Sequence, residues 1–597
     1  MCGIAGYIGN KNTKEELLNL LKGVEYRGYD SAGIAYINQG KIEAIKTAGA
    51  VSRLESILGN PINNTCGIAH TRWATHGKAN TINAHPHLSS DGKWAVVHNG
   101  IIENYLKIKN KLINNNNIKF SSDTDTEVIA QLLQTSNKSN PLQSLKYTCD
   151  KLDGSYALAI ISSITPNTIY VAKNGSPLYV AEGIDGKYIA SDPICFVGKC
   201  NEYFTLLNGE YACVSDKSYM FYDNNLNIIS KTPTKMNFKI EDAGLGKYNH
   251  FMQKEIIQEE DVISRLINTY TENKVFEKLN LDNLNNIDNI ILVGCGTAYH
   301  ASLMGARMIE KYSRIKASAH IASEFRYSNP ILNNKTLAIL VSQSGETADT
   351  LGALEIIKST GIKTIALTNV LYSTLAKNSD YIFPVCAGPE LAVASTKAYI
   401  AQISALYLFS QYLAHVKFNK EYEAPENLQK FTKSNDNYQE DILQLSKDLQ
   451  KASNVFFIGR DIDYITAEEA SLKLKEITYI NSSAYPSGEL KHGFLALVDN
   501  ESILFVIATQ QSLLDKTLNA AHEAYARGAK IVVVSNLNIS KDKLSDIYLN
   551  IHLNDLGEDI MPMSSIRFFQ WLAYHTSVAK GINPDKPRNL AKSVTVE

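Results

Sequence analysis

The chain has 597 residues and a formal net charge of −2 at pH 7, with 59 lysine and arginine residues against 61 aspartate and glutamate residues. Without a basic excess there is nothing to attract nucleic acid or an anionic membrane, so small-molecule partners are expected. Because 44% of the residues are hydrophobic, the chain can bury a core in each of about three domains.

The cysteines and the hydropathy pattern bear on location. The eight cysteines show no Cys-x-x-Cys spacing, and no apolar run approaches the roughly 18 residues of a membrane span. The acidic stretch after residue 12 is unlike a signal peptide. We therefore expect a protein of the reducing cytoplasm.

The chain opens with Met1-Cys2-Gly3. If Met1 is removed, Cys2 carries a thiol nucleophile and an α-amine of pKa ~8 that can take the thiol proton. Taken alone, the pattern favours a cysteine that is only a small apolar filler, so other residues must decide.

Downstream motifs supply what amide hydrolysis at Cys2 needs. The Asn99 side-chain amide and the Gly100 N–H can stabilise an oxyanion from a tight turn. Taken alone, Asn99-Gly100 is equally an ordinary hairpin turn.

Other residues suit the two charged ends of an amino acid. Arg72 matches a carboxylate and Asp125 an ammonium, while Thr75 and His76 can add hydrogen bonds. Singly, Asp125 is also a cap for a helix beginning near Glu127, and Arg72 an ordinary ion-pair partner.

A histidine-rich stretch raises the question of a metal. His70, His76, His85 and His87 are close in sequence. On an extended segment, His85-Pro86-His87 points its two rings to opposite faces, and no further ligands complete a set, so we expect no metal site.

Residues 2 to about 240 resemble the class II, N-terminal-nucleophile glutamine amidotransferase domain. The resemblance implies that Cys2 hydrolyses glutamine and that Asn99 and Gly100 form the oxyanion hole. It also implies glutamine-binding or gating roles, given to Arg72, Thr75, His76, Asp125, a supporting Arg27 and Trp73 as the gate of an ammonia passage.

The grammar of the chain changes along its length. Short alternating runs such as residues 94–98 and 155–161 predict a layered sheet domain with few helices. Beyond about residue 285, buried apolar strands alternate with long helices, which predicts parallel α/β sheets.

The second half contains an internal repeat. The apolar runs at 289–294 and 337–341 recur at 454–459 and 502–506, offset by 165, and 363–369 recurs at 530–536. Two similar α/β lobes are therefore predicted, near 285–424 and 425–585.

The two copies differ after one strand. The first reads Ser342-Gln343-Ser344-Gly345-Glu346-Thr347, which suits a phosphate, whereas the second reads Ile507-Ala508-Thr509-Gln510-Gln511. The hydroxyls of the first copy could merely cap a helix, but we favour a phosphate site because the twin lobe manages without them.

One predicted helix carries Glu469, Lys473 and Glu476 at i, i+4 and i+7, so they share a face. A carboxylate and a lysine on one face can serve as a general base and as a Schiff-base or charged group. On spacing alone, however, a solvated salt pair is favoured, and Thr466-Ala467-Glu468-Glu469 also fits a capping box.

These lobes resemble paired sugar isomerase (SIS) domains, and the whole chain resembles the glutamine:fructose-6-phosphate aminotransferase family, including residues 390–397, 488–493 and 587–597. The resemblance makes Glu476 the isomerising base, His492 of a partner subunit the ring-opening acid and Lys592 the Schiff-base lysine. It implies further sugar-binding positions at Thr297, Ser342, Gln343, Ser344, Thr347, Val393, Ser395, Glu469, Lys473 and Ala591. Ala298 departs from the serine that many relatives carry there.

The resemblance implies an α+β, four-layer N-terminal-nucleophile glutaminase domain followed by two α/β parallel-sheet SIS domains. We expect boundaries at 1–240 for the glutaminase domain, 241–284 for a linker and helical junction, 285–424 and 425–585 for the lobes, and 586–597 for a tail. The expected partners are L-glutamine, D-fructose 6-phosphate and a second copy of the chain, with no nucleic acid, membrane or cofactor. Another class II amidotransferase and a sugar-phosphate sensor are the rival interpretations.

Overall fold

The structure is a computed structural model that describes residues 2–63, 65–73, 76–136, 138, 140–236, 241, 244–279, 286–434, 437–452 and 454–595. The chain forms two compact units. The first unit comprises Met1–Gly246 and Ala591–Glu597, and the second comprises Lys247–Leu590.

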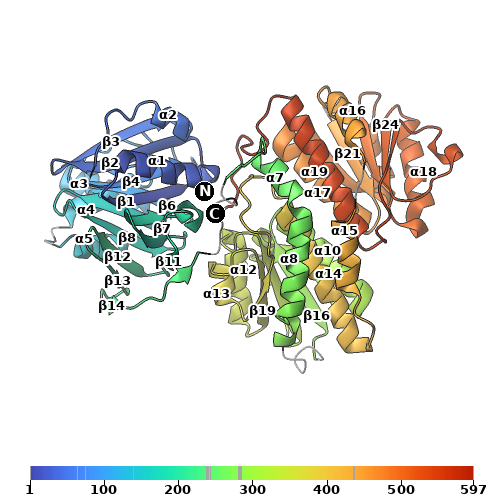
Figure 1. Ribbon diagram of the computed structural model, residues 1–597, viewed down its shortest axis with the longest axis horizontal. Coiled ribbons are helices and arrows are strands. Elements are labelled where there is room, and N and C mark those ends of the chain that lie inside the picture. Colours follow the sequence, from blue (N-terminus) through green and yellow to red (C-terminus); the bar gives the residue numbers. More distant parts are fainter. Residues whose placement is uncertain are drawn as a thin grey trace. The chain divides into compact units, whose positions relative to one another are not determined.

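The first unit contains two antiparallel sheets (Figure 1). The strands of the eight-stranded sheet are, in spatial order, β15 (Thr234–Lys235), β11 (Glu202–Thr205), β9 (Tyr179–Gly183), β10 (Gly186–Ala190), β1 (Gly3–Gly9), β4 (Cys66–Arg72), β2 (Ser31–Asn38) and β3 (Lys41–Ala48). Those of the seven-stranded sheet are β14 (Ile228–Ile229), β13 (Tyr219–Tyr222), β12 (Glu210–Ser215), β8 (Thr168–Asn174), β7 (Gly154–Ser162), β6 (Trp94–Ile102) and β5 (His87–Leu88).

Alternation along β6 shows how the layers are built. Trp94 and Val96 join a core that also contains helical residues, whereas Ala95 and Val97 join the core between the sheets. Helices cover both outer faces, and they are α1 (Thr13–Val24), α2 (Val51–Glu55), α3 (Tyr105–Asn116), α4 (Glu127–Thr135) and α5 (Pro141–Cys149). Helix α1 packs on β1 and β4, and α4 on β6, so the predicted four-layer α+β arrangement is confirmed.

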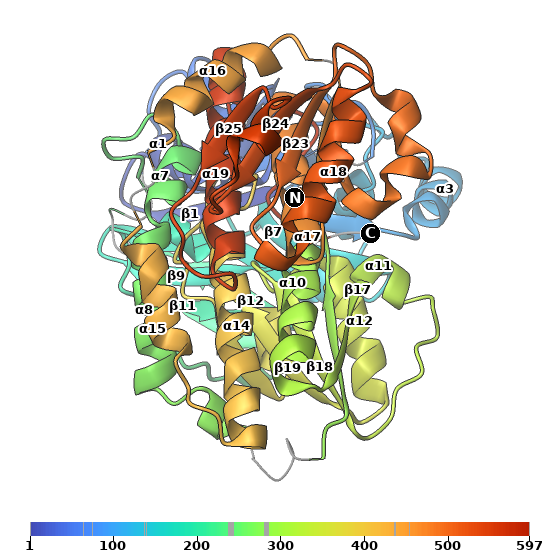
Figure 2. The same ribbon diagram turned by 90° about the vertical axis from the view of Figure 1, so that its right-hand side faces the viewer.

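The second unit contains two parallel sheets with the same strand order (Figure 2). In the first lobe the order is β17 (Lys316–Ile321), β16 (Asn289–Gly294), β18 (Thr336–Ser342), β19 (Lys363–Thr368) and β20 (Tyr381–Pro384). In the second lobe it is β22 (Asn481–Pro486), β21 (Asn454–Gly459), β23 (Ile503–Ile507), β24 (Lys530–Ser535) and β25 (Leu549–His552). The repeated runs in the sequence form corresponding strands, which confirms the predicted pair of lobes.

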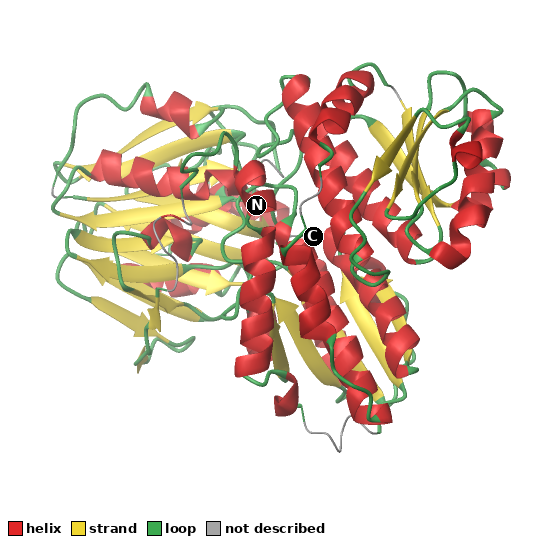
Figure 3. Cartoon of the chain, turned by 45° about the vertical axis from the view of Figure 1, so that its right-hand side comes forward, coloured by secondary structure: helices red, strands yellow, loops and turns green. Residues whose placement is uncertain are grey.

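Helices lie on both faces of each parallel sheet (Figure 3). They are α7 (Phe251–Ile257), α8 (Glu259–Glu272), α10 (Thr297–Ser313), α11 (Ala322–Phe325), α12 (Ala348–Ser359), α13 (Thr374–Asn378), α14 (Lys397–Phe418), α15 (Ala424–Thr432), α16 (Gln439–Leu449), α17 (Ile462–Thr478), α18 (Leu514–Tyr525) and α19 (Met561–Ala579). One hydrophobic core runs through both lobes, because α10 packs on α14, α17 on α19, and α10 on α17.

Across the described residues, no helix combines the length and the apolar character needed to cross a membrane.

Candidate functional sites

Cys2 lies immediately before β1 and is half-buried. Its Sγ accepts a hydrogen bond from the Trp73 N–H at 3.3 Å. Burial raises the pKa of the Cys2 thiol, while the terminal ammonium, the Trp73 N–H and Arg72 act in the opposite direction. Burial and the nearby Asp125 carboxylate outweigh these groups, so the pKa of the thiol stays above its ordinary value.

Asn99 and Gly100 lie inside β6, not in the tight turn that the sequence predicts, so that prediction was wrong. Gly100 has a φ of +132°, and a Cβ there would lie 2.0 Å from the Ser155 carbonyl oxygen, so only glycine fits. The Asn99-Gly100 pair therefore forms an irregular part of strand β6. The Asn99 amide donates to the Cys2 carbonyl oxygen at 2.9 Å, which brings the two predicted catalytic residues together.

The Asn99 amide is held by His70, which the sequence patterns did not assign to this site. His70 Nε2 lies 3.0 Å from Asn99 Oδ1 and 2.9 Å from the His98 carbonyl oxygen. Because burial lowers the pKa of His70 to about 3, the ring is neutral and donates from this nitrogen. No spacing rule in the sequence points to it.

Arg72 and Asp125 both lie near Cys2, since each affects the pKa of its thiol. The buried Arg72 guanidinium donates to the carbonyl oxygens of His76 and, at 3.4 Å, Lys78. Asp125 accepts from the Ile102 N–H at 2.8 Å and makes no capping bond to α4, so the alternative of a simple helix cap is wrong. The His76 ring packs edge-on against Tyr105, and Thr75 lies outside the described residues.

Arg27 and Trp73 have contacts of their own. The buried Arg27 guanidinium pairs with Asp192 at 3.2 Å and donates to the Ser191 carbonyl oxygen at 3.1 Å, and its supporting role stays a prediction. The Trp73 ring meets Tyr29 edge-on, with centroids 5.9 Å apart.

The expectation that His85 and His87 point to opposite faces was wrong. Their ring centroids lie 4.7 Å apart, and His85 also stacks on His70 at 4.1 Å. His85 precedes β5 and so does not follow the alternation of a strand. Burial lowers the pKa of all three rings. Over the part of the chain that the structure describes, no group of three or more His, Cys, Asp or Glu side chains is arranged to hold a metal ion.

In the second unit, the hydroxyl-rich loop follows β18 and precedes α12. Ser342 Oγ accepts from the Gly345 N–H at 3.0 Å and lies 3.2 Å from Thr347 Oγ1. Ser344 Oγ accepts from the Glu346 N–H at 3.2 Å. Thr347 precedes α12 without a side-chain capping bond, so the loop folds around its own hydroxyls and does not simply cap the helix.

On α17, Glu469 and Lys473 are buried and Glu476 is half-buried, so the solvated salt pair favoured by spacing alone is wrong. Glu469 and Lys473 are both 0% exposed. Lys473 Nζ lies 2.7 Å from Glu476 Oε2, 3.4 Å from Glu469 Oε1 and 3.0 Å from Thr297 Oγ1. The capping box fails as well, since α17 begins at Ile462 and places Thr466 in its interior.

The charge on Lys473 follows from this setting. Burial alone lowers the pKa of the ammonium, but Glu469 and Glu476 outweigh it and leave the pKa above its ordinary value. Lys473 is therefore an ammonium at neutral pH, suited to hold carboxylates or a substrate oxygen and unsuited to attack a carbonyl group.

Val393 and Ser395 belong to the loop before α14. The Ser395 hydroxyl donates to Glu390 at 2.9 Å, and the Val393 N–H donates to the Asp585 carbonyl oxygen at 3.2 Å. Glu390 also accepts from the N–H groups of Thr396 and Ala398. The loop is thus rigidly held, and Glu390 adds to the field that raises the pKa of Lys473.

The remaining predicted residues are less tightly placed. His492 is exposed at the end of η4 (Ser487–Lys491), where its backbone N–H donates to the Glu489 carbonyl oxygen. Ala591 and Lys592 are half-buried, and the last residues group with the first unit. Gln343 is half-buried, and its carbonyl oxygen accepts from the Asn369 N–H.

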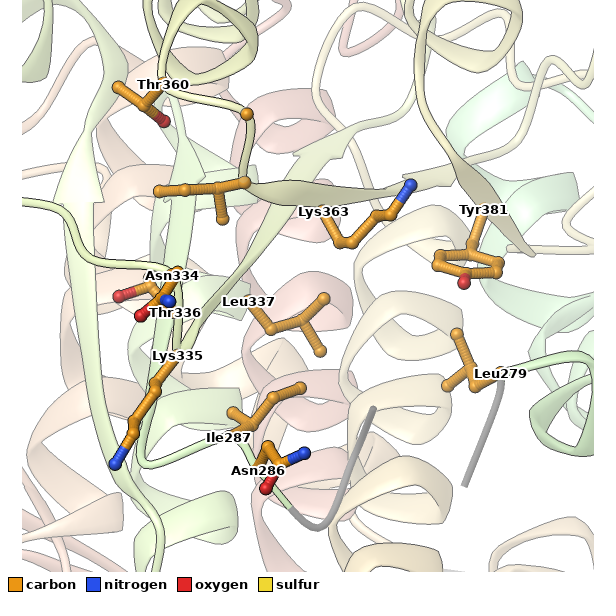
Figure 4. Close-up of a pocket in the computed structure, with 12 residues that line it drawn as sticks. Leu279, Asn286, Ile287, Asn334, Lys335, Thr336, Leu337, Thr360, Lys363 and Tyr381 are labelled. Atoms are coloured by element: carbon orange, nitrogen blue, oxygen red, sulfur yellow. The ribbon is translucent and has the colours of Figure 1, made fainter. Parts of the chain in front are cut away.

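A cavity of about 380 Å³ lies at the amino-terminal ends of the strands of the first parallel sheet (Figure 4). Thr336, Lys363 and Tyr381, which begin β18, β19 and β20, line it. Because the hydroxyl loop follows the carboxyl end of β18, this cavity is separate from it.

Comparisons with known proteins agree with a chain made of an antiparallel-sheet unit followed by two parallel-sheet lobes. A glutamine amidotransferase domain matches residues 70–197, and a SIS domain matches residues 283–411 and 448–567. The C-terminal domain of the Francisella tularensis glucosamine-fructose-6-phosphate aminotransferase superposes with a TM-score of 0.52 at 32% identity, covering 57% of this chain and 99% of that one. A Clostridium novyi protein described as a tagatose-6-phosphate ketose/aldose isomerase, at 17% identity and a TM-score of 0.51 over 58% of this chain and 93% of its own, shares the fold.

Full-length relatives place the whole chain. The glutamine–fructose-6-phosphate aminotransferases (isomerizing) of Clostridium acetobutylicum and Caldanaerobacter subterraneus are 40% and 41% identical to it, each over 100% of both chains. The chain therefore belongs to the glutamine–fructose-6-phosphate aminotransferase (isomerizing) family.

Proposed function

We propose that this protein transfers the amide nitrogen of L-glutamine to D-fructose 6-phosphate and isomerises the product to D-glucosamine 6-phosphate, releasing L-glutamate. The observation that carries the proposal is the presence, in one chain, of Cys2 beside the Asn99 amide and of a Glu469–Lys473–Glu476 face in a pair of SIS lobes. The atoms of the two substrates and the two products balance, so the reaction needs no external oxidant or reductant.

In the first half-reaction, the Cys2 thiolate attacks the glutamine amide carbonyl. The resulting oxyanion is stabilised by the Asn99 amide and the Gly100 N–H. Ammonia leaves, and water then hydrolyses the glutamyl thioester to glutamate. The α-amine exposed by removal of Met1 takes and returns the thiol proton, while Arg72, Thr75, His76 and Asp125 hold the substrate and Arg27 supports them.

In the second half-reaction, the Ser342–Thr347 loop and Thr297 hold the sugar phosphate. The Lys592 amine condenses with the C2 carbonyl group to a Schiff base and releases one water molecule. Ammonia then displaces the lysine amine from C2. Glu476 removes a proton from C1, and C2 is then protonated to give the 2-amino aldose. The Lys473 ammonium is engaged with Glu469 and Glu476, and Lys592 is assigned to the Schiff base from the family resemblance.

The proposal includes a partner subunit and a route for ammonia. The exposure of His492 supports a role in a second copy of the chain, where it would protonate the ring oxygen. The contact of Trp73 with Cys2 supports a gate at the point where ammonia is formed. A cytoplasmic location is supported by the absence of any disulfide among the eight cysteines, all of them described.

The test is to supply glutamine and fructose 6-phosphate to the purified protein and identify the products. We expect glutamate and glucosamine 6-phosphate in equal amounts. Cys2→Ala should abolish glutamine use while leaving fructose 6-phosphate isomerisation measurable, and Cys213→Ala, a half-buried cysteine of the same unit, should change neither. Binding of fructose 6-phosphate without glutamine consumption would support a sensor, and amination of another acceptor would support another amidotransferase.

A second experiment addresses Lys592. Borohydride reduction in the presence of fructose 6-phosphate should trap a covalent adduct on the peptide that contains Lys592. An adduct on Lys473 or any other lysine would overturn the assignment.

A further inference from the structure

Helices α10 and α17 cross the boundary between the two lobes of the second unit in an antiparallel contact. Arg307 donates to Asp461 through Nε at 2.7 Å at one end, and Thr297 accepts from Lys473 at 3.0 Å at the other. His300 lies between these two contacts, one turn into α10. It comes from the opposite lobe to the charged face of α17, and the sequence-based predictions did not include it.

The His300 ring is buried against two carboxylates. Its Nδ1 lies 2.7 Å from Glu469 Oε2, and its Nε2 lies 3.7 Å from Glu468 Oε2. Only 8% of His300 is exposed, and Glu469 is fully buried. Since a carboxylate oxygen accepts, Nδ1 is the donor in this short contact.

The hydrogen bonds of Glu469 determine how Lys473 is shared. Glu469 accepts from His300 on one oxygen and from Thr297 at 3.1 Å on the other. Because both Glu469 oxygens already accept a hydrogen bond, Glu469 competes less for the Lys473 ammonium. Lys473 Nζ therefore lies nearer to Glu476, at 2.7 Å, than to Glu469, at 3.4 Å. Without the His300 donor, the buried Glu469 carboxylate would have an unsatisfied oxygen, and it would attract the nearest cation, Lys473.

We propose that His300 is a positioning residue for the sugar reaction: by donating to Glu469 across the lobe boundary, it keeps Lys473 on Glu476 and so holds the base in its reactive position. The inference rests on the proposed function, because it assigns the consequence to Glu476. It makes the sugar site dependent on a residue that does not touch the substrate.

Other charged and titratable groups face this cluster and enter any pH dependence. Glu468 lies beside the His300 imidazole and the Tyr464 hydroxyl, and the Tyr299 ring lies 6.0 Å from that of His300. Glu390 acts on Lys473 from the loop before α14, and Tyr399 lies close enough to Glu469 for that carboxylate to raise its pKa further after burial. None of these groups is altered in the variants below.

The test compares His300→Leu, which removes the donor, with His300→Asn, which retains one at the Nδ1 position. The measurement is conversion of fructose 6-phosphate to glucose 6-phosphate without glutamine. We expect His300→Leu to lower kcat by roughly 10- to 100-fold with KM changed less than about threefold, because a misplaced catalytic group costs rate more than binding. His320→Leu, the same change at a first-lobe histidine bonded to Ser318, is the matched control and should retain kcat.

A pH profile separates positioning from a merely structural role. When Lys473 moves toward Glu469, the Glu476 carboxylate loses stabilisation, and the acidic limb of kcat should move to higher pH by about half a unit or more in His300→Leu. His300→Asn should restore both the limb and most of the rate. Glutamine hydrolysis should stay unchanged in every variant.

Three outcomes would overturn the inference. These are an unchanged kcat and pH profile in His300→Leu, an asparagine variant as impaired as the leucine variant, or a loss confined to KM. If His300→Leu fails to fold, His300→Gln moves the donor outward toward Glu468 and should show the same loss of kcat. Failure of the wild-type protein to convert fructose 6-phosphate would instead count against the proposed function, which keeps the two failures distinct.

Discussion

The two lobes of the second unit share a strand order but not a chemistry. After β18 the first lobe carries Ser342, Ser344 and Thr347, whereas the loop after β23 is satisfied from within its own lobe. There the Thr509 N–H donates to Asp463 Oδ2 at 2.9 Å, and the Thr509 hydroxyl donates to Oδ1 at 2.5 Å. The Asp463 carboxylate thus takes up hydrogen-bond donors of this loop that would otherwise be open to an anion.

The residue that differs can be identified from the repeat. Asp463 is the second residue of α17, and the second residue of α10, its counterpart after β16, is Ala298. A small side chain leaves the first-lobe loop open at the position that the second lobe closes with a carboxylate. A change at one helix position thus contributes to the difference between the two copies of the fold.

The difference also runs the other way along the two helices. α17 carries the buried Glu469 and Lys473, while the facing part of α10 carries Thr297 and His300, which hydrogen-bond to Glu469. This difference fits the proposal that the first lobe binds the phosphate and the second moves protons.

The largest expected effect comes from the second lobe. Glu476→Gln keeps size and a hydrogen-bonding group but removes the base, so conversion of fructose 6-phosphate should fall by roughly 10²- to 10⁴-fold. Steady-state kinetics with and without glutamine would measure it, and hydrolysis of glutamine should persist. Glu501→Gln, an exposed glutamate of the same lobe outside residues 488–493, is the control. A Glu476→Gln enzyme with near-normal turnover would show that the proton is moved elsewhere.

Sequence patterns predicted the lobes well because buried parallel strands are continuous apolar runs, and a repeat at a fixed offset is visible in the letters alone. They were poorer where one residue decides the geometry. The Asn99-Gly100 pair looks like a hairpin turn in the sequence, yet both residues lie in strand β6. Glycine is required there because its φ is positive and the Ser155 carbonyl oxygen leaves no room for a Cβ. Partners distant in sequence carry that information.

The charged face of α17 shows the same limit. Helical periodicity correctly places Glu469, Lys473 and Glu476 on one side, but it cannot tell a solvated face from a buried one. Burial comes from α10, about 170 residues earlier, whose His300 and Thr297 satisfy the carboxylate. The roles of His492 and Lys592 were available only from family resemblance, and they stay predictions.

The second prediction transfers the closure of one lobe to the other. Ala298→Asp should place a carboxylate against the Ser342–Thr347 loop and weaken fructose 6-phosphate binding by roughly 100-fold, since two unit charges about 5 Å apart repel by about 3 kcal/mol at an effective dielectric constant of about 20. Ala298→Asn, with the same shape and no charge, is the matched control and should weaken binding far less. Equilibrium titration would measure both, and equal losses would mean that position 298 acts through space rather than charge.

The third prediction concerns the closed lobe. Burial raises the pKa of Asp463 to about 6, partly offset by its bonds from Thr509. Between its ordinary pKa and this value the folded state holds a proton that the unfolded chain has released, so the group's contribution to stability falls as pH rises through about 4 to 6.

Asp463→Asn removes that titration and can still pair with Thr509. The unfolding free energy at pH 7.5 minus that at pH 4.5 should therefore be more positive than in the wild type by about 1–3 kcal/mol, because the loss of stability that Asp463 contributes on raising the pH disappears. Urea unfolding at the two pH values would measure it, with Asp515→Asn, an exposed carboxylate of the same lobe, as control. An unchanged pH dependence would show that Asp463 does not titrate in this range.

The smallest expected effect is the converse change in the open lobe. Ala298→Ser adds a hydroxyl at the position from which Asp463 reaches the corresponding loop of the second lobe. A neutral hydrogen bond contributes about 1 kcal/mol net, so fructose 6-phosphate binding should tighten by roughly fivefold, less if a water molecule already fills the position. The measurement is the equilibrium affinity for fructose 6-phosphate, with Ala301→Ser, four residues after Thr297 in the same helix and fully buried, as a control for the added hydroxyl alone. Unchanged or weaker binding in Ala298→Ser would mean that position 298 does not face the phosphate, and the correspondence between Ala298 and Asp463 would then hold for the backbone but not for the ligand.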